Sequence, residues 1–239
     1  MRLVTRVHRS LIQGFEMNRL KMPWLIAAAL LCTAATPTEQ IRDRVVAEAR
    51  ALSPAALSFD RTMTVTQADS KEKASQTRVD RWDGKVWTLL SLDGKPPSAD
   101  DRAKHAKAAA AGFVPGYYRL AGMLAVASAS LDARGQTVLR MASLPPKSVI
   151  TSGKDVTENF TGEAVVAGGT RPFVQQLRLT ARAPFRMMLV TKIESFVTVS
   201  DYARGPDGTP RLVRSVADIR GSMMGKDGTQ RVETIFTYR

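Results

Sequence analysis

The stretch 160–181 reads FTGEAVVAGGTRPFVQQLRLTA, in which two β-type runs flank the pair Gly168-Gly169. In the second run Leu177 and Leu179 alternate with polar residues. A period of two is typical of a strand that buries one face and leaves the other in water. Because glycine pairs favour tight turns, this stretch predicts a β-hairpin.

The same pattern extends to both sides of this hairpin. Asp83-Gly84 separates two further β-type runs, and an Asp-Gly pair in such a place is a strong hairpin signal. We expect further turns at 205–208 and 225–228. The expected strands cover 57–66, 73–82, 85–91, 129–133, 136–142, 160–167, 171–181, 185–202, 210–220 and 229–239. Consecutive hairpins of this kind predict an antiparallel meander, and thus a mainly β fold.

A few helices accompany these strands. The first is expected at 38–52, where Ile41, Val45 and Ala49 fall on one face and Pro54 follows the end. Two more are expected at 98–111 and 116–127. The helix at 38–52 is short and amphipathic and should lie against something apolar. The helix at 98–111 is rich in alanine and should bury little area, whereas the helix at 116–127 is more apolar.

The long strand expected at 185–202 is apolar on both faces. Met187, Leu189 and Ile193 would share one face, with Met188 and Phe196 on the other. A strand buried on both faces packs against a core on one side and against helices or a ligand on the other. Ordinary core packing and a lipid-lined cavity are both consistent with this pattern.

Residues 1–35 resemble an export signal. Basic residues precede the apolar run 24–31, and Thr33-Ala34-Ala35 supplies small residues where a signal peptidase cleaves. We therefore expect a removed signal peptide, a single mature domain over 36–239, and a periplasmic location. Alternatives are a later start at Met17 or Met22, an uncleaved anchor, and lipidation of Cys32, although Leu31 fits a lipidation signal poorly.

The charge balance is basic, with 35 Lys and Arg against 22 Asp and Glu and a net charge of +13. The basic residues are scattered through the strands and form no block. This favours a solvated surface over a binding patch, with contact to an anionic membrane surface as the alternative. We do not expect a nucleic-acid partner.

Few residues are available for catalysis or metal binding. Beyond residue 35 there is no cysteine, and His105 is the single histidine. Thiol nucleophiles and the usual zinc ligand sets are thereby excluded. His105 itself is expected to be exposed on its helix. The stretch 221–227 hints at a phosphate loop but joins two strands, so a hairpin is favoured. We therefore predict that the protein is not an enzyme and that it binds no cofactor and no metal ion.

Three segments carry a family resemblance. They are FDRTMTV at 59–65, WTLLSLDG at 87–94 and PFRMMLV at 184–190. With the order of helix, hairpins, helical insert and long meander, the chain resembles the LolA/LolB-like superfamily of periplasmic lipoprotein-localisation carriers. The resemblance implies a curved antiparallel sheet, an open half-barrel, with helices over its concave face.

This resemblance implies a carrier or binding protein for a lipid or lipoprotein-like hydrophobic cargo. Its partner would be a lipid or the acyl chain of a lipoprotein. The alternative is a non-catalytic structural or protein-interaction domain of the cell envelope with a filled core. The apolar lining is expected among Phe59, Met63, Trp87, Leu89, Leu177, Leu179, Met187, Leu189 and Ile193.

Overall fold

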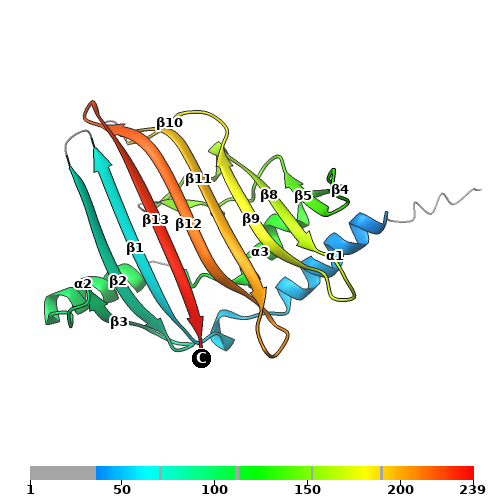
Figure 1. Cartoon of the computed structure of the whole chain (residues 1–239), viewed down its shortest axis with the longest axis horizontal. Helices are drawn as coiled ribbons and strands as arrows, with labels where there is room; N and C mark the ends of the chain where they lie inside the picture. The colour runs from blue at the N-terminus through cyan, green and yellow to red at the C-terminus, as the bar shows by residue number, and fades with distance from the viewer. Residues whose placement is uncertain (1–35, 70–71, 111–112, 152, 189–190) are drawn as a thin grey trace, which may run out of the picture. The chain divides into compact units, whose positions relative to one another are not determined.

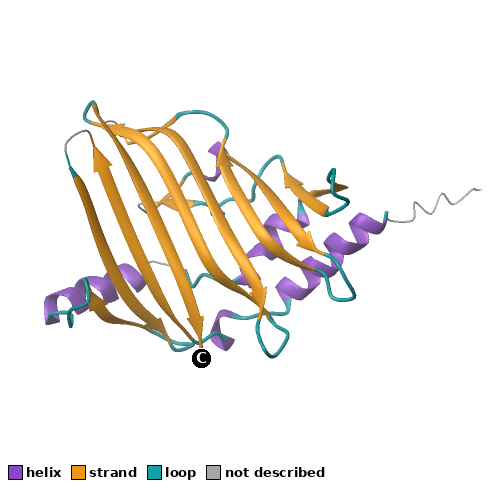
Figure 2. Cartoon of the chain, viewed as in Figure 1, coloured by secondary structure: helices purple, strands orange, loops and turns teal. Residues whose placement is uncertain are grey.

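Antiparallel strands dominate the computed structural model (Figures 1 and 2). It describes residues 36–69, 72–110, 113–151, 153–188 and 191–239, all within one compact unit. The expected signal segment, its possible start sites and Cys32 lie outside the described residues. None of the helices in the described part of the chain has both the length and the apolar character that a membrane span requires.

Eleven strands form one sheet with the order β3-β2-β1-β13-β12-β11-β9-β8-β5-β4, and β10 pairs with β11 beside this path. The sheet is open, with β3 and β4 at its edges, which confirms the predicted fold class of a large antiparallel sheet with a few helices. The strands are β1 (Phe59–Asp69), β2 (Lys73–Trp82), β3 (Trp87–Leu92), β4 (Ser128–Leu131), β5 (Thr137–Met141), β8 (Phe160–Ala167), β9 (Phe173–Ala181), β10 (Phe185–Met188), β11 (Thr191–Arg204), β12 (Pro210–Met223) and β13 (Lys226–Tyr238). A separate two-stranded sheet joins β6 (Ile150–Thr151) to β7 (Lys154–Asp155).

The first and last strands of the chain lie side by side. β1 pairs with β13 from Phe59 opposite Tyr238 to Asp69 opposite Gly228. The N-terminal hairpins β1–β2–β3 are thereby joined to the C-terminal meander (Figure 1). As a result, the inner strands of the sheet come from opposite ends of the sequence.

The prediction of a single strand over 185–202 is wrong. The structure forms β10 and β11 there, and these pair antiparallel with Phe185 opposite Ile193 and Met188 opposite Thr191. β9 pairs with β11 only over 197–201, so the first part of β11 would have an unpaired backbone edge there. β10 supplies the missing hydrogen-bond partners. The two-faced arrangement derived from one continuous strand therefore does not hold.

The last hairpin turns earlier than expected. β12 and β13 are joined by Met224-Gly225, whose φ angles are 52° and 77°. Two successive positive φ angles are typical of the tight turns that suit the twist of paired strands. The stretch 221–227 thus forms a hairpin, as predicted.

The helices are α1 (Pro37–Arg50), α2 (Ala99–Ala110) and α3 (Leu120–Ala125), with short 3₁₀ turns at Pro54–Ala56, Tyr117–Arg119 and Thr157–Asn159. α1 begins with a capping box in which Thr36 and Glu39 bond to each other's backbone amides. Both α1 and α3 contact β5, whereas α2 contacts β3 at the opposite edge of the sheet.

All three helices lie against one face of the sheet, which we call the inner face. The register joins the following inner-face residues in one row across the sheet: Arg78, Met63, Thr234, Ser215, Ser200, Leu177, Ala164 and Leu139. Leu139 and Ala164 pack in the core with α1 and α3. At the other end, Asp80 lies two residues from Arg78 on β2 and contacts α2 through His105.

Candidate functional site

Small side chains occupy the inner face between α2 and the α1–α3 pair. In the row described above these are Thr234, Ser215 and Ser200. In the next row Val65, Val232, Ala217 and Thr198 lie opposite one another on four neighbouring strands, and all four are half-buried. Thr234 and Ser200 are buried, and Val65 lines the first of two hollows on the inner face.

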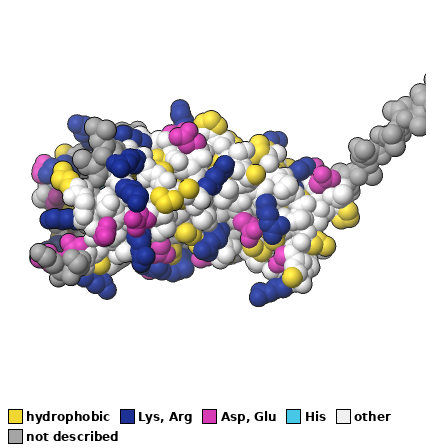
Figure 3. Space-filling view, turned by 90° about the horizontal axis from the view of Figure 1, so that it is seen from above, with side chains coloured by type: hydrophobic (Ala, Val, Ile, Leu, Met, Phe, Trp, Pro, Cys, Tyr) yellow, Lys and Arg dark blue, Asp and Glu magenta, His cyan; other side chains and the backbone are white. Residues whose placement is uncertain are grey.

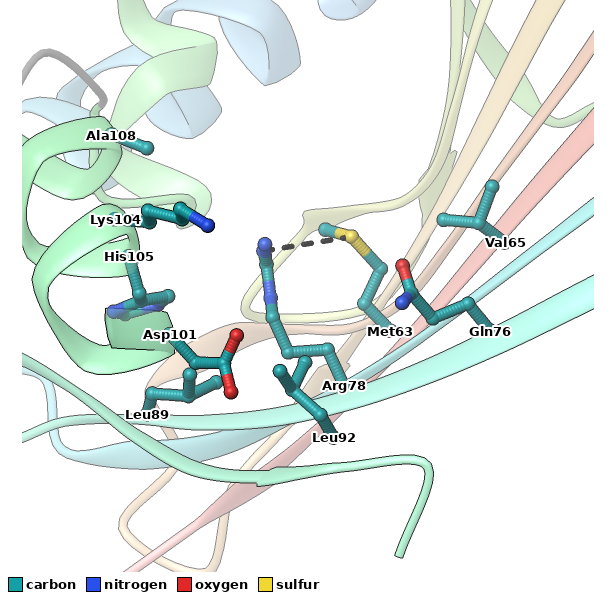
Figure 4. Close-up of a pocket in the computed structure, with 10 residues that line it drawn as sticks. All are labelled: Met63, Val65, Gln76, Arg78, Leu89, Leu92, Asp101, Lys104, His105 and Ala108. Carbon is teal, nitrogen blue, oxygen red and sulfur yellow. Dashed lines mark hydrogen bonds between the residues drawn. The ribbon is translucent and has the colours of Figure 1, made fainter. Parts of the chain in front are cut away.

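The first hollow is a cavity of about 280 Å³ beneath α2, which we call the α2 cavity. Its walls come from β1, β2, β3 and α2, and their side chains converge on it in Figure 4. The lining residues are Met63, Val65, Gln76, Arg78, Leu89, Leu92, Asp101, Lys104, His105 and Ala108. The cavity therefore combines apolar walls with two cations and one carboxylate.

A buried ion cluster lies behind this cavity, centred on Asp80, whose side chain is 1% exposed. Arg61 donates two hydrogen bonds of 2.7 Å, from Nε to Oδ1 and from Nη2 to Oδ2. Nε2 of His105 lies 3.1 Å from Oδ2, and Nε of Arg78 lies 3.1 Å from the same oxygen. Since an ionised carboxylate only accepts hydrogen bonds, Nε2 of His105 carries the proton in its bond to Asp80.

The cluster keeps Asp80 ionised. Burial alone would raise the pKa of Asp80. The hydrogen bonds and charge of Arg61, the charge of Arg78 and the bond from His105 outweigh this effect and hold the pKa of Asp80 below its usual value. One carboxylate thus serves two guanidinium groups, and the cluster retains an excess of positive charge.

The second hollow has a volume of about 540 Å³ and follows the first along the inner face. We call it the tip groove, because its walls are the ends of the β1–β2 and β12–β13 hairpins and the start of β11. Its apolar floor includes Ile193 and Ile219. Met63 and Val65 line the α2 cavity and Gln67 and Asp69 line the tip groove, so the hollows succeed each other along β1.

The structure places the nine expected lining residues in different surroundings. Met63 and Leu89 line the α2 cavity, and Ile193 lines the tip groove. Three residues are buried in the packed core, namely Phe59, Leu177 and Leu179. Trp87 and Met187 are half-buried and pack against that core, and Leu189 lies outside the described residues.

The charged part of the site was missed by sequence reasoning. The one sequence signal of this charged part is Arg61, which interrupts the apolar face of β1. The expectation that His105 is exposed is wrong, since α2 turns this side chain onto Asp80 and leaves the residue 8% exposed. The alanines of α2 allow a close approach, and a histidine with a carboxylate partner can be buried there.

Charged side chains of both signs cover the face of the molecule that Figure 3 shows. In the view of Figure 3, Lys and Arg side chains are spread over the surface with acidic side chains among them, and no single basic patch dominates. In the described part of the chain, no three His, Cys, Asp or Glu side chains come together as a candidate metal site.

Comparison with known proteins gives no family for this chain. No family model matches it, and no curated protein does. Among solved structures it is similar to a DUF1329 family protein from Desulfovibrio piger, at 11% identity and a TM-score of 0.33, over 85% of this chain and 94% of that one. It is also similar to a LolA superfamily protein from Nitrosomonas europaea, at 11% identity and a TM-score of 0.24, over 86% and 94%. Neither likeness is strong enough to carry an argument about the site.

Proposed function

We propose that this chain is an exported, periplasmic binding protein or carrier for a lipid-like hydrophobic cargo, which it holds on the inner face of its sheet. The observation that carries this proposal is the pair of adjoining hollows along β1. Ligand sites in proteins commonly enclose about 300–1,000 Å³ and are lined mainly by apolar side chains with a few polar groups. The tip groove falls within that range of volumes, and the α2 cavity lies just below it.

The function would rest on burial and not on reaction chemistry. Each methylene of a cargo chain that leaves water contributes about 0.8 kcal/mol. Val65 on β1 lines the α2 cavity, and the half-buried Val232 and Ala217 continue its row on β13 and β12, whose ends line the tip groove. An acyl chain placed along β1 would cover Val65. Export is supported by the pattern of residues 1–35.

The test begins with mass spectrometry of organic extracts from the purified protein. We expect lipid to copurify with the wild type and to be reduced at least tenfold in Ile219→Glu, which places a charge on the floor of the tip groove. The matched control is Ile235→Glu, because Ile235 lies on the opposite face of the sheet and is 48% exposed. A lipid-free wild type, with no uptake of added lipid, would favour the structural or protein-interaction alternative.

A further inference from the structure

Arg78 is the group in the α2 cavity whose bonding is least complete. It lies opposite Met63 on the inner face, and its side chain is 33% exposed. Nη2 is 3.7 Å from the sulfur of Met63, which is a weak acceptor, and Figure 4 draws this contact across the cavity. The buried Nε faces Oδ2 of Asp80 at 3.1 Å as an ion pair without hydrogen-bond geometry, so Nη2 is the donor that points into the cavity. A guanidinium has five N–H donors, so donors of Arg78 remain available.

The nearest carboxylate reaches Arg78 on its inner side, where Nε lies 3.1 Å from Oδ2 of Asp80. Asp80 also accepts two hydrogen bonds from Arg61 and one from His105. Asp101 also lines the cavity, but its Oδ2 accepts from the backbone amide and the hydroxyl of Ser98 at 3.0 and 2.6 Å, which caps α2. Burial lowers the pKa of Arg78, because removing water from the charged guanidinium disfavours its charged form.

A second cation stands on the other wall of the cavity. Lys104 extends from α2 toward the cavity, as Figure 4 shows, and its ion pair with Asp100 is exposed to solvent. Exposed ion pairs are weak, so Lys104 can turn toward a ligand at little cost. Arg78 and Lys104 therefore face the same space from β2 and from α2.

From this arrangement we propose that the α2 cavity recognises the oxyanion headgroup, a carboxylate or phosphate, of an amphipathic ligand whose tail runs along β1 into the tip groove. This proposal rests on the proposed function. Arg78 would bind the headgroup, since guanidinium groups bind carboxylates and phosphates with two parallel hydrogen bonds. Lys104 would add a second charge.

The position of the tail follows from the order of lining residues on β1. Met63 and Val65 line the α2 cavity, whereas Gln67 and Asp69 line the tip groove on the same face of the same strand. The distance from Met63 to Asp69 is about 20 Å at the usual rise of a strand. A single long acyl chain can therefore contact both hollows while its headgroup stays at Arg78.

The experiment compares ligands that differ only in the headgroup. Binding of hexadecanoate, hexadecyl phosphate and hexadecanol is measured by isothermal titration or by displacement of a fluorescent fatty acid. We expect the two anions to bind on the order of tenfold or more tightly than the alcohol, as a charge-assisted hydrogen bond provides. Acetate and inorganic phosphate lack the tail, so they should displace neither hexadecanoate nor hexadecyl phosphate.

Arg78→Gln should bring the affinities of anions and alcohol together without weakening the alcohol. The matched control is Arg81→Gln, three residues away on the outer face of β2, where the side chain is equally exposed at 34% and pairs with Asp60. Arg81→Gln should keep the full preference. If Arg78→Gln does not fold, Arg78→Lys and Lys104→Gln test the same claim, with a partial loss expected for each.

The outcomes separate this proposal from the proposed function. Equal binding of hexadecanoate and hexadecanol by the wild type would overturn the headgroup claim and leave the carrier proposal standing. Binding of inorganic phosphate as tightly as hexadecyl phosphate would also overturn it, because the cavity would then be a small-anion site. Failure of all three long-chain ligands to bind would overturn both.

Discussion

The Asp80→Asn substitution is the sharpest test of the ion cluster. It removes the negative charge that two guanidinium groups share and leaves one carbonyl oxygen as an acceptor. Arg61 then becomes a cation that is 15% exposed and has lost its bidentate partner. Removing one member of a buried ion pair typically costs about 3–5 kcal/mol. Since Arg78 is partly exposed and can be solvated, we expect a loss at the lower end, about 3 kcal/mol.

Urea unfolding of the purified variants measures this loss as a change in the free energy of unfolding, with an unchanged dependence of that free energy on urea concentration. The control is Asp60→Asn on the outer face of β1, where Arg81 and Arg239 are the partners and the carboxylate is more exposed. We expect about 2 kcal/mol or less for this control, because the carboxylate is partly exposed.

A double variant identifies the source of the loss. In the Asp80→Asn background, Arg61→Met removes the unpaired buried charge, so it should restore part of the lost stability and show a positive coupling between the two sites. The reasoning would be refuted if Asp80→Asn were no more costly than Asp60→Asn, or if Arg61→Met lowered the stability of the variant further.

Three further results are expected. Hydrogen bonds from Arg81 and Arg239 hold the pKa of Asp60 at about 2, below the usual 3.8. The stabilising contribution of Asp60 is therefore present above about pH 4 and is lost as pH falls toward 2. The stability difference between wild type and Asp60→Asn should shrink over this range in acid titrations monitored by circular dichroism. Burial raises the pKa of Tyr238 to about 12 from 10.0, so its contribution is present below about pH 10 and is lost as pH rises to 12, and Tyr238→Phe should unfold less steeply in alkali. Gly84→Ala should lower the free energy of unfolding by about 1–3 kcal/mol in thermal unfolding, because φ is +95° and the new Cβ would lie 2.8 Å from the carbonyl oxygen of Ala55. Gly94→Ala, with φ of +75° and open space around it, should cost less. An equal cost for the two variants would contradict the steric argument.

Local features of the sequence predicted the hairpins well. The turns at Asp83-Gly84 and Gly168-Gly169 lie between β2 and β3 and between β8 and β9, and β2 and β8 have the expected bounds. In each case the turn residues lie directly between the two alternating runs, so one short stretch of sequence indicates both the position of the turn and which two strands pair.

Non-local pairings were not predicted, for a physical reason. The pairing of β1 with β13 joins residues more than 150 positions apart, and no turn signal specifies it. The pairing of β10 with β11 was missed because the sequence stays apolar from Met187 to Val190, so the period alone did not mark a reversal of the chain. Pairing there depends on the free edge of β11, which only the assembled sheet creates.

The charged site was hidden for the same reason. Arg61, Asp80 and His105 come from β1, β2 and α2, and each looks ordinary within its own segment. Arg61 and Asp80 are opposite each other in the register, which depends on the length of the hairpin they share. The packing of α2 on the sheet then brings His105 to Asp80. Neither relation is visible in composition or spacing.

The position of the cluster says more about ligand binding than about stability. Buried ion pairs are often no more stabilising than apolar side chains of the same size, because removing charges from water offsets their attraction. The α1–α3 end of the same inner face packs with apolar residues such as Leu139 and Leu177. Charges occur instead where the sheet and α2 enclose a cavity, and the Nη2 donor of Arg78 there faces a weak acceptor, the sulfur of Met63. An oxyanion brought by a ligand would complete that bonding, which makes the α2 cavity the part of the inner face where a cargo would be selected by charge and not by apolar area alone.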